Sequence, residues 1–588
     1  MDYGLHVAVV VAAHSIKMDR DLVRLSTTCY DLLIVGGGIY GACAAWEAVL
    51  RGLSVALVEQ GDFGGATSAN SQKIVHGGLR YLQHADFKRM RQSIREREIL
   101  MQIAPHLIHP LPCVLPTYRG SLHNRQLLRL ALAVYDLMAA DRNRGLVDPQ
   151  KRIPRCRILS KAECLRLVPG ISPEELTGGA LWHDAQVYNS ERLTLAFIRS
   201  ATEAGAQVAN YVRVTELLRQ GTRVVGARAQ DVLTAQPLDI QARLVLNTSG
   251  PWVDRLLAGL NGSGQRLLSS YLKAMNLVTR SLTDGVALGV SPRSNAAIHR
   301  GLLFVAPWRN RSIIGTAYAP FDGHPDDCRV TEEEIEEFLV QINRAYPVAL
   351  SRDEVSFVHV GLVPAASRDF TKGIPHLETR YRLVDHQRRD GIDGLVSVVG
   401  VKYTTARDVA EKAVNVVLAK LGKPTPRPLR REAPLWGGRI EQFEAFLGEA
   451  IRQRLWGLGP TVIRHLVYSY GSAYQDVLRL LGENLAWGEL VPGSSEVLKA
   501  EVVYALRHEM AVKLSDVVFR RTDLGTLGHP GLQALHSCAN LMADELDWNA
   551  ARLFREVEDT EAVFARMGAR RMPEGHVTTE PSYVEELG

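Results

Sequence analysis

Three glycines near the start of the chain have the spacing that binds the diphosphate of a dinucleotide. Gly36, Gly38 and Gly41 form a G-x-G-x-x-G motif. In this motif the first glycine makes a tight turn, the second lets backbone approach the pyrophosphate, and the third lets a helix pack closely on a strand. Glu59 lies 18 residues beyond Gly41, where its carboxylate would accept hydrogen bonds from ribose hydroxyls. A flexible glycine loop is the alternative, and it does not explain the acid.

The segments around these glycines predict the elements that would position them. Residues 32–35 form a continuous apolar run, typical of a parallel strand that is buried on both faces. A helix is predicted over 39–50 and a second strand over 54–58. Because free N–H groups at a helix start attract phosphate, we expect this Rossmann-type unit to bind a dinucleotide. The motif by itself does not separate FAD from NAD.

Later apolar runs indicate that the nucleotide-binding domain is interrupted by insertions. Residues 244–247 are followed by a turn at Gly250, and residues 395–399 end at Gly400. The intervening sequence has its own element signals: strands at 301–306 and 312–316 and a helix at 331–346 with an acidic first turn. A proline-rich link over 423–434 precedes a mostly helical region, with predicted helices at 462–470 and 497–513.

A second stretch that could contact a cofactor, residues 64–82, reads GGATSANSQKIVHGGLRYL. It resembles the flavin-contacting loop and helix of the FAD-dependent glycerol-3-phosphate dehydrogenases, which have a TSS-x-S-x-K-x-x-HGGLRYL sequence there. The resemblance covers most of the chain from 30 to about 522, through an ordered series of motifs at 104–107, 247–254, 304–315, 400–405, 470–472 and 507–509. An ordered series is a more specific signal than any single motif.

The resemblance implies FAD as the cofactor. Thr67 and Ser68 can donate hydrogen bonds to phosphate oxygens, and small residues are expected where backbone approaches the flavin ring. Val212 resembles the position that offers backbone to the adenine, with an ordinary core valine as the alternative. The expected cofactor-binding residues are Gly36, Gly38, Gly41, Glu59, Thr67, Ser68, Lys73, His76, Gly77, Gly78, Val212, Gly250, Gly400 and Thr404.

The predicted fold class is α/β and α+β, with three parts after an N-terminal extension over 1–29. A Rossmann-type FAD-binding domain would occupy about 30–110, 190–255 and 355–423. A mixed-sheet substrate domain would be inserted at about 111–189 and 256–354. A helical C-terminal domain would follow over 424–588. We expect the first 17 residues to be either a loose extension or the product of an upstream start codon.

The family implies a small phosphorylated polyol as substrate, held by basic side chains near the flavin. Arg80, Arg380 and Lys402 match family positions that bind the phosphate or lie near the reacting carbon. An arginine fork donates two parallel charge-assisted hydrogen bonds to phosphate. Arg380 could instead be a solvated surface charge. The implied reaction is oxidation of sn-glycerol 3-phosphate to dihydroxyacetone phosphate, with electrons passed to a quinone-type acceptor or, as in some relatives, to oxygen.

The chain departs from the family pattern at positions that would surround the substrate. Asn276 stands where the family has a histidine, and Val363 stands where it has an arginine. The family's Gly-Thr-Thr-Asp reads Gly-Thr-Ala-Tyr over 315–318. Loss of one bidentate arginine removes roughly 1.5–3 kcal/mol of charged hydrogen bonding. Because Asn276 is not a base, His359 and His76 are the candidate proton acceptors.

Two other functions stay open beside this one. The first is a related FAD-dependent dehydrogenase or oxidase of another small hydroxy acid, polyol or amine. The second is a non-catalytic flavoprotein, which the retention of Arg80, Lys402 and His76 disfavours.

The composition of the chain narrows the classes of partner that it could bind. The formal net charge is +5 from 69 basic and 64 acidic side chains, which gives no support for nucleic-acid binding. The seven cysteines form no CxxC pair and no metal-ligand spacing, so we expect a cytoplasmic protein without a metal site. Residues 126–140 form an apolar helix flanked by arginines, which suits either a peripheral contact on the cytoplasmic membrane face or a core helix. Formation of a homodimer is a further possibility that the sequence leaves open.

Overall fold

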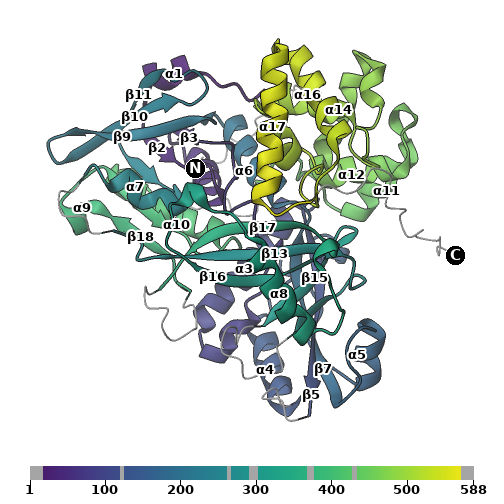
Figure 1. Cartoon of the computed structure of the whole chain (residues 1–588). Coiled ribbons are helices and arrows are strands. Elements are labelled where there is room, and N and C mark those ends of the chain that lie inside the picture. The colour runs from purple at the N-terminus through teal and green to yellow at the C-terminus, as the bar shows by residue number, and fades with distance from the viewer. Residues whose placement is uncertain are drawn as a thin grey trace, which may run out of the picture.

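The structure is a computed structural model that describes residues 17–119, 125–260, 266–290, 302–366, 377–426 and 433–570. Its described strands form three sheets, and its C-terminal helices gather beside them at one end of the molecule (Figure 1). The predicted class, a Rossmann-type domain with a mixed-sheet insertion and a helical C-terminal domain, is confirmed.

A six-stranded sheet forms the centre of the nucleotide-binding part. Its order is β18 (Arg382–Asp385), β19 (Leu395–Val399), β12 (Val245–Asn247), β2 (Leu32–Val35), β3 (Val55–Val58) and β8 (Gln207–Ala209). The strands from β19 to β8 run parallel. The predicted strand, turn, helix and strand over 32–58 are therefore present, with the helix α2 at Ile39–Leu50.

Both faces of this sheet are buried, which explains the unbroken apolar runs of its strands. Leu32 and Ile34 pack toward α2, α6 (Ser190–Glu203) and α10 (Ala406–Lys420) in one core. Leu33 and Val35 pack on the other side against a four-stranded sheet. That sheet has the order β1 (Cys29–Tyr30), β11 (Pro237–Ala242), β10 (Arg223–Asp231) and β9 (Val212–Gln220).

A larger sheet forms the inserted part. Its path is β17 (Val355–Pro364), β13 (Tyr271–Arg280), β16 (Arg311–Phe321), β15 (Leu303–Trp308), β14 (Ala287–Val290), β5 (Ile108–Tyr118), β7 (Leu176–Val187) and β4 (Ile74–Val75), with β6 (Arg157–Leu159) beside β7. The helix α8 (Glu332–Ala345) packs on one face and begins at a capping box of Thr331 and Glu334. Because β17 pairs with β13, the strand over 355–364 joins this sheet rather than the FAD-binding part to which its sequence was assigned.

The C-terminal helices pack against the large sheet. They include α11 (Phe443–Gln453), α12 (Pro460–Tyr470), α14 (Lys499–His508), α15 (Leu514–Asp516), α16 (Leu532–Leu546) and α17 (Ala550–Arg566). One apolar core joins them to the large sheet, with Trp308 and Phe357 from strands packed near Val502 and Val517. The helix predicted over 497–513 ends early at His508, and Met510 beyond it has a φ of +56°.

The segment before the first domain is more ordered than the expected extension. Met18 is buried, α1 spans Leu22–Thr27, and β1 pairs in parallel with β11. Residues 1–16, the proline-rich stretch 427–432 and the last 18 residues lie outside the described residues. Among the described helices, none is both long and apolar enough to cross a membrane.

Candidate active site

A cavity of about 760 Å³ lies where the six-stranded sheet meets the large sheet, within the size range of small-molecule and cofactor sites. The glycine turn after β2, the end of β3 and the loop 64–72 line one part of it. The strands β13, β16 and β17 and the loop 400–403 line another part. Nucleotide-binding and substrate-side elements therefore share one space.

The glycine turn has the geometry that a diphosphate requires. Gly36 has a φ of +106°, a conformation that side-chain-bearing residues rarely adopt. A Cβ on Gly41 would lie 1.9 Å from the Gly36 carbonyl oxygen, so the close approach of α2 to the strand needs a glycine there. The first turn of α2 faces the cavity, and the Ile39 N–H donates to the Ser68 hydroxyl oxygen at 3.0 Å. This helix start can hold an anion.

Glu59 lies at the end of β3 and lines the cavity, as the dinucleotide motif predicts. Its carboxylate accepts hydrogen bonds from the Gly37 N–H at 2.7 Å and the Gly61 N–H at 2.9 Å. Burial raises the pKa of Glu59. Val212 also lines the cavity, and its N–H donates to the Glu59 carbonyl oxygen at 2.8 Å. The Val212 side chain is buried in the core, and its contact with the adenine stays a prediction.

Lys402 is a charged residue that lines the cavity from the loop 400–403. Its Nζ donates a hydrogen bond to the Tyr81 hydroxyl. Burial, reinforced by the charges of Arg89 and Arg80, lowers the pKa of Lys402 to about 8. Gly400 precedes it and also lines the cavity.

Three of the positions that depart from the family pattern line the cavity, namely Asn276, Tyr318 and Val363. The Asn276 Oδ1 accepts from the Thr316 hydroxyl at 2.8 Å, and its Nδ2 donates to the Asn70 carbonyl at 3.4 Å. Its amide is therefore engaged by protein groups. Val363 presents an apolar side chain from β17.

The structure divides the expected site residues into two groups. Those that line the cavity are Gly36, Gly38, Glu59, Thr67, Ser68, Val212, Gly250, Gly400 and Lys402. Those outside its lining are Gly41, Lys73, His76, Gly77, Gly78, Arg80, His359, Arg380 and Thr404. The Thr67 hydroxyl donates to the Leu362 carbonyl at 2.9 Å, so it can accept but not donate a hydrogen bond to a phosphate.

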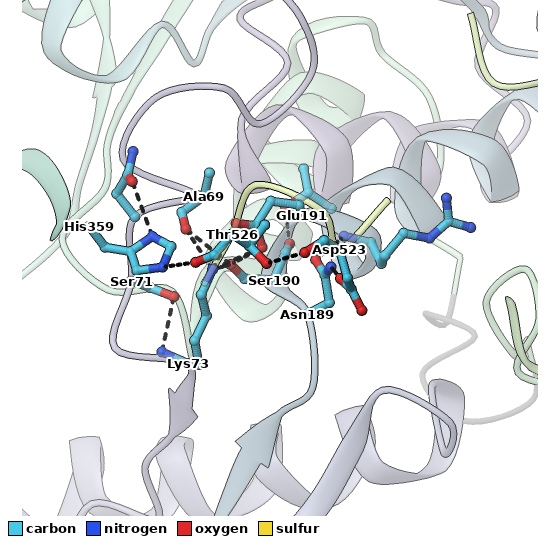
Figure 2. Close-up of polar contacts among 12 residues, drawn as sticks. Ala69, Ser71, Lys73, Asn189, Ser190, Glu191, His359, Asp523 and Thr526 are labelled. Atoms are coloured by element: carbon cyan, nitrogen blue, oxygen red, sulfur yellow. Dashed lines mark hydrogen bonds and ion pairs between the residues drawn. The ribbon is translucent and has the colours of Figure 1, made fainter. Parts of the chain in front are cut away.

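Lys73 and His359 are outside the cavity lining and contact the loop 64–72, Lys73 through the Ala69 carbonyl and His359 through the Asn70 side chain (Figure 2). Lys73 is fully buried, and its Nζ donates to the Ala69 carbonyl at 2.7 Å and to the Glu191 carboxylate at 2.8 Å. The prediction that Lys73 contacts the cofactor is therefore corrected: Lys73 supports the loop that lines the cavity.

His359 is corrected in the same way. It is 2% exposed, and its ring nitrogens lie 3.3 Å from Asn70 Oδ1 and 3.2 Å from the Thr526 carbonyl oxygen. Burial holds the pKa of His359 well below its usual range. A buried ring with both nitrogens engaged by protein groups is poorly placed to take a substrate proton, so His359 is withdrawn as a candidate base.

The HGGLR segment lies beside the cavity. His76 Nδ1 is 2.9 Å from Asp184 Oδ2, and the Gly77 N–H donates to Asp184 Oδ1 at 2.7 Å. The His76 N–H donates to the Thr404 hydroxyl oxygen at 3.3 Å. Arg80 is exposed, and its charge opposes the rise that burial causes in the pKa of Tyr318.

Arg380 is exposed and outside the lining, as its alternative interpretation expected. Several lining residues were missed by the sequence analysis. Asp62 bonds both to Arg521 and to Asn210, and Arg520 from the C-terminal domain also lines the cavity. No local pattern connects positions so distant in sequence.

Comparison with known families agrees with this geometry. A family model described as FAD dependent oxidoreductase matches residues 31–401. The chain belongs to the FAD-dependent oxidoreductase family. A second model, described as the C-terminal domain of alpha-glycerophosphate oxidase, matches residues 430–553. FAD is therefore the cofactor of this flavoprotein fold, and the glycine turn, Glu59 and the helix start provide groups that fit it.

Three relatives of this chain are named glycerol-3-phosphate dehydrogenase. A glycerol-3-phosphate dehydrogenase of Synechocystis is 32% identical over 92% of this chain and 97% of its own. One of Mycobacterium leprae is 31% identical over 91% and 88%. The solved glycerol-3-phosphate dehydrogenase of Bacillus halodurans, complexed with FAD, superposes with a TM-score of 0.73 at 25% identity, covering 93% of this chain and 97% of that one. The resemblance inferred from the motifs is confirmed.

Proposed function

We propose that this chain oxidises sn-glycerol 3-phosphate to dihydroxyacetone phosphate and passes the electrons to a quinone-type acceptor. The observation that carries the proposal is the similarity to glycerol-3-phosphate dehydrogenases along nearly the whole chain, in both the FAD-binding and the C-terminal regions. The cavity is consistent with it, because a dinucleotide turn and the half-buried Lys402 line the same cavity.

The reaction removes a hydride from C2 and a proton from the hydroxyl on C2. Bound FAD supplies the acceptor for the two electrons of the hydride. The chain must supply the proton acceptor and the groups that orient the phosphate.

His76 is the proposed proton acceptor now that His359 is withdrawn. Asp184 contacts its Nδ1 at 2.9 Å, and a carboxylate there holds the tautomer that leaves Nε2 free to take a proton. The His76 side chain is 43% exposed, so a proton taken up there can return to solvent.

Lys402 and Arg80 are the proposed partners of the substrate's negative charge. A lysine with a pKa of about 8 is mostly cationic at pH 7 and would stabilise a developing alkoxide. Arg80 lies close enough to lower the pKa of Lys402, and its fork suits phosphate. Arg380 stays a secondary candidate for the same role.

Helix α4 (Arg125–Met138) supports a peripheral membrane contact, which would bring a lipid-soluble acceptor near the protein. Leu127, Leu130 and Leu137 are 60%, 63% and 76% exposed, whereas Leu132 and Tyr135 are buried. One apolar face of the helix therefore remains in solvent. Arg129 and Arg144 are exposed nearby in sequence and would favour anionic lipid. Arg142 is paired with Asp136.

A steady-state comparison tests the proposal. Glycerol 3-phosphate, glycerol and small hydroxy acids would be offered with an artificial electron acceptor, and the phosphate ester should have the highest kcat/KM. The second candidate is oxidation of another small hydroxy acid, polyol or amine, and it rests on the departures from the family pattern at Val363 and Asn276. It would be adopted if glycerol 3-phosphate is not turned over and one of the others is.

A further inference from the structure

We infer that Tyr40 is a positioning residue whose hydroxyl fixes the loop 400–402 and thereby holds Lys402 at the cavity. The inference rests on the proposed function in one respect, that Lys402 acts on the substrate. The placement of Lys402 by Tyr40 can be tested without turnover.

A single phenol oxygen satisfies three backbone groups of this loop. The Tyr40 hydroxyl donates to the Lys402 carbonyl at 2.8 Å and accepts from the Val401 N–H at 3.1 Å and the Lys402 N–H at 3.1 Å. A hydroxyl has one proton to donate and two lone pairs, so its hydrogen-bonding capacity is filled. Burial raises the pKa of Tyr40 to about 12, which keeps the donated proton on the oxygen.

The loop is shaped to receive the Tyr40 ring. A Cβ on Gly400 would lie 2.2 Å from Tyr40 Cε2 and 2.3 Å from its Cζ, closer than atoms in contact can lie. The ring therefore sits directly against the Gly400 backbone. A glycine at 400 and a tyrosine at 40, 360 positions apart in the sequence, form one complementary contact.

This contact links the two parts of the cavity. Tyr40 is in the first turn of α2, two residues after Gly38, so it belongs to the helix start that lines the cavity. Lys402 extends from the fixed loop to the Tyr81 hydroxyl, and Arg80, Arg89 and Asp86 are the charged groups that act on it. Without the Tyr40 hydroxyl, two N–H groups and one carbonyl of the loop lose their partner, and the loop must move to regain hydrogen bonds.

The test is Tyr40→Phe, which deletes one oxygen and keeps the ring. Competitive acylation followed by peptide mass spectrometry would give the apparent pKa of Lys402, in apo and FAD-loaded protein. We expect this pKa to rise from about 8 toward the ordinary lysine value, because a released side chain regains solvent. The kcat should fall about tenfold while FAD content is retained.

Tyr30→Phe is the matched control. Tyr30 is a buried tyrosine of the same domain and donates one hydrogen bond, to the Arg24 carbonyl at 3.2 Å, away from the cavity lining. It should leave the Lys402 labelling profile unchanged. If Tyr40→Phe does not fold, Gly400→Ala replaces it, since the added methyl displaces the same ring and should release Lys402 equally.

The inference is overturned if a folded Tyr40→Phe or Gly400→Ala protein labels Lys402 with the unaltered profile. Release of Lys402 with full turnover would leave the positioning role of Tyr40 standing and would instead remove Lys402 from the proposed reaction.

Discussion

Gly38 and Val363 line the same cavity. A substitution at Gly38 tests cofactor binding, and a substitution at Val363 tests substrate binding. We expect the diphosphate of FAD to bind beside Gly38, because this residue precedes the helix whose first N–H groups face the cavity. Val363 bears on the binding of the substrate's phosphate, because the family has an arginine at this position and this chain has an apolar side chain.

Replacing Gly38 with glutamate should abolish FAD binding. The backbone φ of −72° accepts a side chain, but a carboxylate there would repel the diphosphate. Absorbance of the purified variant measures its flavin content. Gly459→Glu is the control, because that glycine also has a φ of about −71° and open space at its Cβ. Stoichiometric FAD in a folded Gly38→Glu protein would show that the diphosphate binds elsewhere.

Replacing Val363 with arginine should lower the KM for glycerol 3-phosphate. A guanidinium at this position restores a charge-assisted contact worth roughly 1.5–3 kcal/mol, or about tenfold to a hundredfold in KM. Steady-state kinetics would compare it with Val340→Arg, an arginine added at a half-exposed position on α8. An unchanged or raised KM in Val363→Arg, with FAD retained, would mean that the phosphate does not reach β17.

At the scale of elements, local pattern predicted the strand and helix of the nucleotide-binding unit. The strand at Leu32–Val35 and the helix at Ile39–Leu50 follow from one apolar run and one glycine turn, because neighbouring residues determine them. Lys73 and His359 were misplaced for the opposite reason. Their motifs identify the right loop and strand, but spacing does not tell which side of a loop faces the cavity and which faces Glu191 or Thr526. The contact between Asp62 and Arg521 has no local signal at all.

Helix α4 should bind anionic membranes through its exposed leucines. Burying three leucyl side chains is worth several kcal/mol at roughly 1.5–3 kcal/mol each. Flotation with anionic liposomes should recover the protein in the lipid fraction, and Leu130→Glu with Leu137→Glu should abolish the recovery. Leu485→Glu, at a 73% exposed leucine of the C-terminal domain, is the control. Full recovery of unaltered protein in the soluble fraction, with or without anionic lipid, would remove the membrane contact.

At the scale of the whole molecule, buried ion pairs join the C-terminal helices to the other parts. Asp523 accepts from Arg309 of the large sheet at 2.6 Å, and Asp62 near the cofactor turn accepts from Arg521 at 2.6 Å. Removing one partner of such a pair costs about 3–5 kcal/mol, because the other charge stays buried. The C-terminal domain thus supports the walls of the cavity, and its stability bears on the whole enzyme.

His465 should make this stability depend on alkaline pH. Its Nε2 lies 2.9 Å from Glu501 Oε2. Burial opposes its charge, but Glu501, Glu496 and Asp523 outweigh burial and raise the pKa of His465 to about 10. Because the pKa of His465 is higher in the folded than in the unfolded protein, protonation of His465 stabilises the fold. This stabilisation is complete below the unfolded-state pKa of about 6.5 and is lost as the pH rises through about 10. The melting temperature should therefore fall between pH 7 and 10, and His465→Gln should flatten that slope. An equal slope in both proteins would contradict the assignment.

Anaerobic titration of the FAD-loaded protein with glycerol 3-phosphate tests the central claim most directly. The proposed function predicts that the visible flavin absorbance is bleached, with one dihydroxyacetone phosphate formed per flavin reduced and little bleaching by unphosphorylated glycerol. His76→Gln, which removes the proposed proton acceptor but not the glycine turn, should bind FAD and bleach more slowly. A flavin that stays oxidised with glycerol 3-phosphate and is reduced by an unphosphorylated alcohol or amine would contradict the proposed substrate.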